Sequence, residues 1–160
     1  MKNDTKAHGR LWWLGIGLLA GNMLLVAATP ALAETAGMVK TSKGVADIER
    51  NGQKLAAAVG TSVEARDRIV TGADGAVGIT LRDNTLLTAG PNSVLELNKF
   101  AFDTTTHAGT LDVGVKKGTL AVISGKLAKT HPHAVSFFTP TTTLGVRGTE
   151  FIIEAGQAGE

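Results

Sequence analysis

The histidines are the residues whose spacing points most directly to chemistry. His131 and His133 lie on either side of Pro132, and two imidazoles two positions apart in an extended segment can face one metal ion. Pro132 also fixes the backbone, so the two rings need not converge. His107 is the one other histidine after the first ten residues. Because no third ligand lies near the pair in sequence, we expect no metal and no other cofactor.

Other reactive groups lack the patterns that catalysis requires. The 160 residues include no Cys, which excludes a thiolate metal site, a cysteine nucleophile and a disulfide framework. The sequence also has no G-x-S-x-G nucleophile elbow, no phosphate-binding loop and no H-E-x-x-H zinc motif. We therefore expect no catalytic residues, and the protein is predicted not to be an enzyme.

One charged pair near the C-terminus invites a choice between two roles. Arg147 and Glu150 bracket Gly148 and Thr149, where they can present a recognition point for an anionic ligand or tie a turn by hydrogen bonds. An exposed ion pair contributes only ~0 to 1 kcal/mol. We favour the structural role, with Gly148 adopting a backbone angle that other residues disfavour.

The charge distribution excludes whole classes of partner. The chain has 16 Lys or Arg and 14 Asp or Glu, and its formal charge of +2 is accounted for by Lys2, Lys6, Arg10 and Asp4. The remaining residues, from 34 to 160, are balanced and contain no cluster of one sign. Steering of a phosphate backbone or an anionic membrane surface needs such a cluster, so we expect no nucleic-acid partner.

The first 33 residues have the three regions of a secretion signal. A basic segment to Arg10 precedes an uncharged run from Leu11 to Thr29, and Pro30 leads into Ala31, Leu32 and Ala33. We predict a signal-peptide helix that is cleaved between Ala33 and Glu34. The alternative is a retained anchor, since the run is about as long as the ~17 to 25 residues of a membrane span. Either way, the positive charges stay inside and the rest of the chain is exported, with the membrane contacted only through this segment if it is uncleaved.

The part that follows, residues 34–160, is predicted to be a single all-β domain. It is rich in Gly, Thr and Val, and short apolar stretches alternate with turn residues. The pair Asn51-Gly52 predicts a tight hairpin. We expect consecutive strands to be neighbours in a rolled sheet or a short β-helix-like arrangement. The strands are predicted at residues 45–50, 53–55, 69–71, 77–81, 85–89, 93–100, 135–139, 143–146 and 151–154.

Two segments of this part need separate comment. Residues 102–109 are polar and Thr-rich, which predicts an exposed loop. Residues 109–113 and 118–122 match at four of five positions. The match is either a coincidence in a Gly- and Thr-rich chain or one repeated rung of a solenoid or arm of a hairpin.

The order of short motifs over residues 37–154 resembles the FecR domain, the extracytoplasmic module of bacterial iron-transport regulators that also occurs in many exported proteins. Its sharpest element is the ending at residues 147–151. The resemblance implies an all-β fold and a role in sensing or protein contact in the periplasm. The residues that match the family signature, which we expect to be mainly structural, are Asp67, Ile69, Thr71, Gly72, Gly75, Gly118, Pro140, Arg147, Gly148, Thr149, Glu150 and Phe151.

The same resemblance limits the expected function. Iron-transport regulators bind a sigma factor through a sizeable cytoplasmic region. Only Met1 to Arg10 precede the apolar run here, so we do not expect binding of a sigma factor. We expect a non-catalytic periplasmic module that binds a partner protein or envelope polymer, through an open strand edge at residues 143–146 or 151–154. The alternative is a structural β-domain that assembles with itself or with the cell surface, and the oligomeric state is left open.

Overall fold

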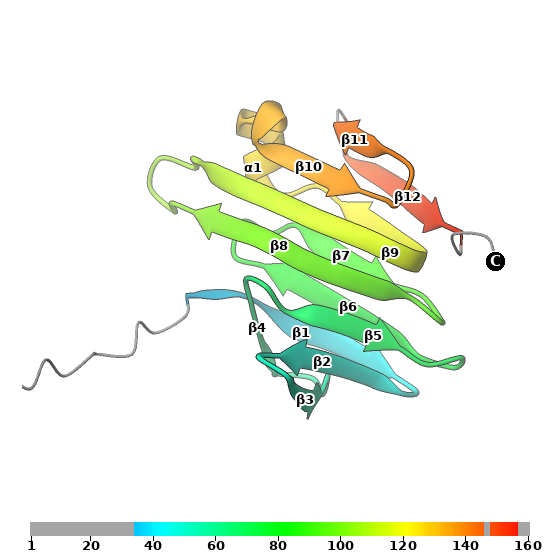
Figure 1. The fold of residues 1–160 in the computed structure, drawn as a ribbon. Coiled ribbons are helices and arrows are strands. Elements are labelled where there is room, and N and C mark those ends of the chain that lie inside the picture. Colours follow the sequence, from blue (N-terminus) through cyan, green and yellow to red (C-terminus); the bar gives the residue numbers. More distant parts are fainter. Residues whose placement is uncertain (1–33, 146–147, 157–160) are drawn as a thin grey trace, which may run out of the picture. The chain divides into compact units, whose positions relative to one another are not determined.

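The computed structural model describes residues 34–145 and 148–156, and it confirms the all-β prediction. These residues form one rolled sheet that folds back on itself as two facing layers (Figure 1). The predicted signal segment, with Ala31 and Ala33, lies outside the described residues, while Glu34 is exposed and pairs with Arg82. Within the described ranges, no helix has the length and apolar character needed to cross a membrane.

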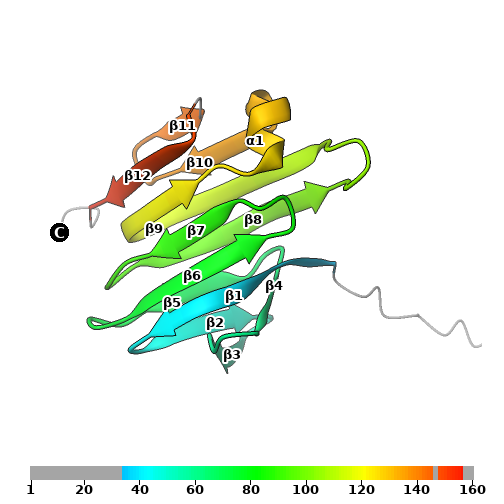
Figure 2. The same ribbon diagram turned by 180° about the vertical axis from the view of Figure 1, so that it is seen from behind.

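The two layers share a single strand. Layer I is nearer the viewer in Figure 1, and its strands are β3 (Gln53–Ala56), β2 (Ala46–Arg50), β5 (Arg68–Thr71), β8 (Val94–Phe102), the first part of β9 (Gly109–Ile123), β10 (Val135–Phe138) and β11 (Thr143–Gly145). Layer II is nearer the viewer in Figure 2, and its strands are β4 (Ser62–Glu64), β1 (Thr35–Lys43), β6 (Ala76–Leu81), β7 (Leu86–Ala89), the last part of β9 and β12 (Glu150–Ala155). Two short helices, α1 (Lys126–Thr130) and η1 (Pro132–Ala134), connect β9 to β10.

Strand β9 passes from one layer to the other at a bend. Residues up to Lys117 pair with β8, whereas residues from Gly118 onward pair with β12 and β7. Gly118 has φ +83°, and a Cβ at this position would collide with Ser93. Ser93 fixes the bend, because its Oγ accepts a hydrogen bond from Thr119 N at 2.9 Å. Glycine is therefore required where the sheet folds over.

The core fills the space between the layers with aliphatic side chains from alternate strand positions. In layer II, for example, Val77, Ile79 and Leu81 are buried, as the two-residue period of a strand predicts. From layer I, Leu111, Val113 and Val115 of β9 are equally buried. Phe137 is the largest of the fully buried side chains and reaches the core from β10. The domain is held by this core, since it has no disulfide.

One buried carboxylate joins three strands. Asp67 is fully buried, and its carboxylate accepts hydrogen bonds from Arg50 Nε at 2.8 Å and Nη2 at 2.7 Å and from Glu64 N at 2.8 Å. Arg50 Nη1 also contacts Glu64 Oε1 at 2.6 Å. The hydrogen bond with Asp67 raises the pKa of Arg50, so the guanidinium stays charged. The pair thus ties β2 to the segment between β4 and β5.

A second buried carboxylate holds the helical connection. Asp83 accepts hydrogen bonds from Thr85 N at 3.0 Å and Thr85 Oγ1 at 2.7 Å in the turn between β6 and β7. Its backbone oxygen accepts a bond from Lys126 N at 2.7 Å, and Leu127 of α1 is fully buried. The helix is therefore docked on the β6–β7 turn, although it has only five residues.

Most predicted strands are confirmed within two residues at each end, and the hairpin at Asn51-Gly52 joins β2 to β3 as expected. The loop prediction is also confirmed, because the residues between β8 and β9 form exposed turns. Two expectations about order are wrong. Strands β7 and β8 are not neighbours, since the chain crosses from layer II to layer I at residues 90–93. Residues 109–113 and 118–122 are neither rungs nor hairpin arms, because both lie in the one bent strand β9.

Replacing Arg50 by Met is expected to lower the free energy of unfolding by about 3 to 5 kcal/mol, because it leaves the carboxylate of Asp67 buried without its cation. Arg68→Met is the matched control. Arg68 lies on the neighbouring strand and makes an exposed pair with Glu49 at 3.1 Å, so its loss should cost about 1 kcal/mol or less. Urea unfolding followed by circular dichroism measures both; equal losses would contradict the assigned role of Asp67.

Candidate functional site

The two strand edges singled out from the sequence converge on one groove. Strand β11 pairs only with β10, and β12 pairs only with β9, among the strands that the structure describes. Between them lies a groove of about 290 Å³. Its lining comes from both strands and the turn before β12, namely Leu144, Gly145, Gly148, Glu150, Phe151, Ile152 and Ile153.

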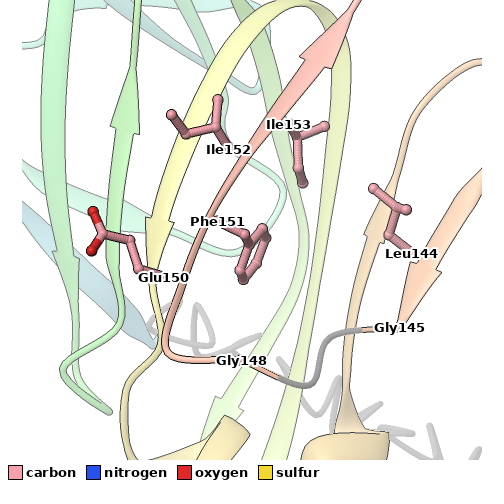
Figure 3. Close-up of a pocket in the computed structure, with 7 residues that line it drawn as sticks. All are labelled: Leu144, Gly145, Gly148, Glu150, Phe151, Ile152 and Ile153. Atoms are coloured by element: carbon pink, nitrogen blue, oxygen red, sulfur yellow. The ribbon is translucent and has the colours of Figure 1, made fainter.

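The alternation of β12 separates an apolar groove side from a charged outer side. Phe151 and Ile153 face the groove opposite Leu144, whereas Glu150 and Ile152 are directed away from it (Figure 3). Ile153 is buried, but Ile152 is 66% exposed and Leu144 is 36% exposed. Large aliphatic groups at this exposure, beside unpaired strand edges, are a feature of surfaces that receive another chain.

Local contacts determine where β12 begins and how it is held. Ser124, at the end of β9, donates from Oγ to Gly148 O at 2.8 Å and from its backbone N to Thr149 O at 2.7 Å. Phe151 then packs its ring against Phe137 at 5.3 Å in an edge-to-face arrangement. The groove floor is therefore rigid, since its aromatic is fixed by the core of layer I.

The charges at the groove are acidic. Glu150 and Glu154 are exposed at alternate positions of β12, and neither makes an ion pair with another residue that the structure describes. A strand placed beside β12 would set its own outward side chains opposite these two carboxylates. Opposite charges across such a pair stabilise it and like charges destabilise it.

The predicted signature residues fall into three structural groups. Buried members of β5 and its approach are Asp67, Ile69 and Thr71. Turn and bend positions are Gly72, Gly75, Gly118 and Pro140. At the groove are Gly148, Thr149, Glu150 and Phe151, while Arg147 lies outside the described residues.

Members of the first two groups fix places where the chain changes direction. Thr71 Oγ1 donates to Gly90 O at 2.6 Å and accepts from Ser93 N at 2.8 Å, which fixes the crossing from β7 to β8. Gly75 allows the 72–75 turn to approach Val45, where a Cβ would collide with the Val45 carbonyl oxygen. The geometry of the signature residues is thus that of a scaffold, and only the last group reaches the groove.

The histidine motif takes a different conformation from the one expected. His131, Pro132 and His133 are not extended, because Pro132 begins the short helix η1. Thr130 Oγ1 donates to His107 O at 3.3 Å, so the 102–109 loop lies against the end of α1. Among the described residues, no group of three or more His, Asp or Glu side chains has the geometry to hold a metal ion.

The His107 loop is ordered by its own turn. Asp103 accepts backbone hydrogen bonds from Thr105 and Thr106, each at 2.8 Å. These bonds lower the pKa of Asp103 below its ordinary value, and the bond from Thr106 has the largest effect. The ring of His107 stacks on Phe102 with the centroids 6.0 Å apart. This arrangement is accounted for by loop structure alone.

Sequence reasoning found the two edges but missed what surrounds them. It identified neither β1 nor the parallel pairing of β10 with β9, which carries β11 to the groove. It also missed the exposed Ile123, which lies beside Glu150 on the outer face of layer II. The sequence does contain a signal for Ile123. Side chains alternate between the two faces of a strand, and Val122 and Ser124 on either side of Ile123 are buried, so Ile123 must face outward.

The comparison with known proteins yields one family. The family model described as FecR protein matches residues 67–160, which is more than half of the chain. No curated protein and no solved structure matches. The matched range includes the bend of β9 and the whole groove, but it does not include β1 to β4.

Truncation of the two adjacent isoleucines of β12 should change the stability by very different amounts. Ile153→Ala removes buried side-chain volume and is expected to lower the free energy of unfolding by about 2 to 5 kcal/mol. Ile152→Ala changes a side chain that is 66% exposed and should shift it by about 0.5 kcal/mol or less. Chemical denaturation of both variants checks the orientation of β12; a large loss for Ile152→Ala would place that side chain in a core.

Proposed function

The chain belongs to the FecR family, and from this premise we propose that it is a non-catalytic periplasmic module that binds a partner protein in sensing or signalling. FecR is a regulatory and signalling family whose domain typically faces the periplasm, and that general role is what membership brings. Binding of one partner protein by strand addition is the specific function proposed here, in preference to binding of an envelope polymer.

The observation that carries this proposal is the convergence of two half-paired strands on an apolar groove. An edge strand presents N–H and C=O groups that a neighbouring chain can complete, and its pockets select the alternate side chains of that chain. Strand β12 offers six residues of such an edge, and the groove offers Leu144, Phe151 and Ile153 for the side chains.

The groove defines the chemistry of the segment that it accepts. An extended segment beside β12 would direct every second side chain over Phe151 and Ile153, which favours apolar residues there. Its other side chains would lie on the side of Glu150 and Glu154, which favours Lys or Arg. The expected ligand is therefore an extended strand with apolar and basic residues in alternation.

The proposal includes export. A basic start, an uncharged run and the Ala31-Leu32-Ala33 ending support cleavage before Glu34, with 34–160 as the mature domain. With this division of the chain, the proposal assigns the groove to the periplasm, which the domain of this family typically faces.

Expression of the full chain in a Gram-negative host tests the leader. Because cleavage is expected after Ala33, the recovered protein should have an intact mass lower than that of the full chain by the mass of residues 1–33. Replacing Ala31 and Ala33 by Asp should prevent the loss, since charged side chains do not fit the small-residue site of the peptidase. Recovery of the unmodified chain at full mass would establish a retained anchor.

Site-specific photocrosslinking in cells tests strand addition at the groove. A photoreactive phenylalanine analogue at Leu144 is expected to yield a discrete adduct with one envelope protein, because Leu144 faces the site of the added strand. Leu55 is the matched control, as it is also 36% exposed and lies on β3, the edge strand at the other end of layer I. Mass spectrometry of the adduct should locate an extended segment in which apolar and basic residues alternate.

The adduct must depend on the groove. Glu150→Lys with Glu154→Lys should reduce its yield, because the outward charges would then repel the basic residues of the segment. Equal adducts from Leu144 and Leu55, or no adduct from a chain that remains folded, would refute binding at this edge. An adduct with twice the mass of the protein would assign the groove to a second copy instead.

A further inference from the structure

The outward residues of layer II form cross-strand rows. In the first row, Met38 of β1, Thr80, Leu86, Ile123 and Glu150 of β12 are paired one after another. In the second row, Thr41, Gly78, Thr88, Ala121 and Ile152 are paired in the same way. The rows cross five strands without interruption, from β1 through β6, β7 and β9 to β12 (Figure 2).

A third row lies beyond these two. Lys43 of β1 pairs with Ala76, and Glu154 of β12 pairs with Thr119. Gly90 joins the two halves, because its N–H donates to Thr119 O at 3.0 Å. On β7 this row is represented by Gly90, which directly follows the last residue of the strand. Like the other two rows, it begins on β1 and ends on β12.

The ionisable groups of these three rows lie only on β1 and β12. Lys40 is the unpaired residue at the register shift between Val39 and Thr41, and its Nζ lies 3.8 Å from Met38 Sδ, beside the first row. Lys43 begins the third row. Glu150 and Glu154 end the same two rows on β12. The third row therefore runs from Lys43 to Glu154, and the first row has Lys40 beside its β1 end and Glu150 at its β12 end. None of these four side chains makes an ion pair with another described residue.

The side chains in the middle of the face are uncharged and mostly short. Its outward residues on β6, β7 and β9 are Ala76, Gly78, Thr80, Leu86, Thr88, Thr119, Ala121 and Ile123. The outer face of layer I differs, because its strands carry ion pairs such as Arg68 with Glu49 and Lys116 with Glu96. Small uncharged side chains allow a second sheet to approach closely, so this face is the better packing surface of the two.

From this arrangement we propose that the outer face of layer II packs against the same face of a second copy. A two-fold axis parallel to the strands and centred over β7 places each row on the same row of the other copy, with β1 of one copy over β12 of the other. Lys40 then faces Glu150 of the second copy, and Lys43 faces Glu154. A two-fold axis across the strands would instead place lysine on lysine and glutamate on glutamate, so the charges select the first arrangement.

The size of the face determines the strength of the contact. Five strands ~4.8 Å apart and three rows of side chains cover roughly 400 Å² on each copy, which is about half of the ~800 Å² per partner in a typical stable complex. The dimer therefore forms reversibly at high protein concentration. Aligned sheets cross at about 30°, and the flexible lysine stems bridge the offset that this angle produces at the margins.

Sedimentation velocity over a range of concentrations tests the proposal on the protein recovered from an exporting host. The wild type is expected to shift from monomer toward dimer as its concentration rises. Lys40→Glu with Lys43→Glu makes both margins acidic and should weaken association about tenfold or more, since it replaces four attractive contacts by repulsive ones. The reciprocal variant, Glu150→Lys with Glu154→Lys, should weaken it similarly.

Mixing the two variants provides the decisive measurement. An acidic copy and a basic copy are expected to associate with each other at least as well as the wild type does with itself. The matched control is Lys99→Glu with Lys116→Glu, which changes the net charge equally on exposed lysines of layer I and should leave association unchanged. A wild type that stays monomeric, a control that weakens association equally, or a mixture that does not associate would each overturn the proposal.

A chemical crosslink locates the axis. Because the chain contains no Cys, Thr88→Cys introduces a single thiol on β7. The proposed axis places this thiol next to the same thiol of the second copy. A short bis-maleimide should join two such chains severalfold faster than chains carrying Thr110→Cys, an equally exposed position on the other layer. Equal rates would exclude the axis over β7, and this result does not depend on the groove between β11 and β12.

Discussion

The bend of β9 is the constraint on which the rest of the structure depends. One strand supplies pairing partners to β8 and β10 in layer I and to β7 and β12 in layer II. Without the left-handed backbone of Gly118, residues 109–123 would continue as a straight strand and the two layers would not face each other. Ser93 completes the bend by bonding Thr119, and Thr71 holds Ser93 in turn. A hydrogen-bonded chain of small polar side chains thus creates the space that the aliphatic core fills.

The same bend explains why the candidate binding features lie where they do. In each layer, β9 pairs with a neighbouring strand on both of its edges. It therefore adds β10 and β11 to layer I and β12 to layer II, beyond the strands that close the core. These last strands are paired on one side only, and the layers diverge enough between them to leave the apolar groove. On the outer face of layer II, strands β6, β7 and β9 lie side by side and carry mostly small uncharged residues. The free edge of β12 and the outer face of layer II share Glu150 and Glu154, so strand addition and pairing of two copies compete for these two carboxylates.

Much of this architecture could be predicted from local signals. The Asn51-Gly52 hairpin, the alternation of Val77, Ile79 and Leu81, and the glycine turns are all properties of short segments. Nine of the twelve strands that the structure describes were predicted close to their positions, whereas β1, β4 and β9 were not. Even the groove strands were identified, because short apolar stretches near the C-terminus are separated by turn residues. The partners of those strands could not be predicted. Whether β8 pairs with β7 or with β5 is decided by where the chain crosses between layers, and that crossing depends on Thr71 and Ser93, which are 22 positions apart.

The sequence by itself determined an all-β domain without thiols, with balanced charge and with the ordered motifs of its family. These are consequences of residue type and short-range spacing, which a single chain displays directly. Only the tertiary structure decided that two similar segments form one bent strand, that His133 lies in a short helix with His131 at its N-cap, and that lysines of β1 and glutamates of β12 lie on the same outer face. The physical reason is that register and layer crossing arise from contacts between residues far apart in the chain, and no local pattern specifies such contacts.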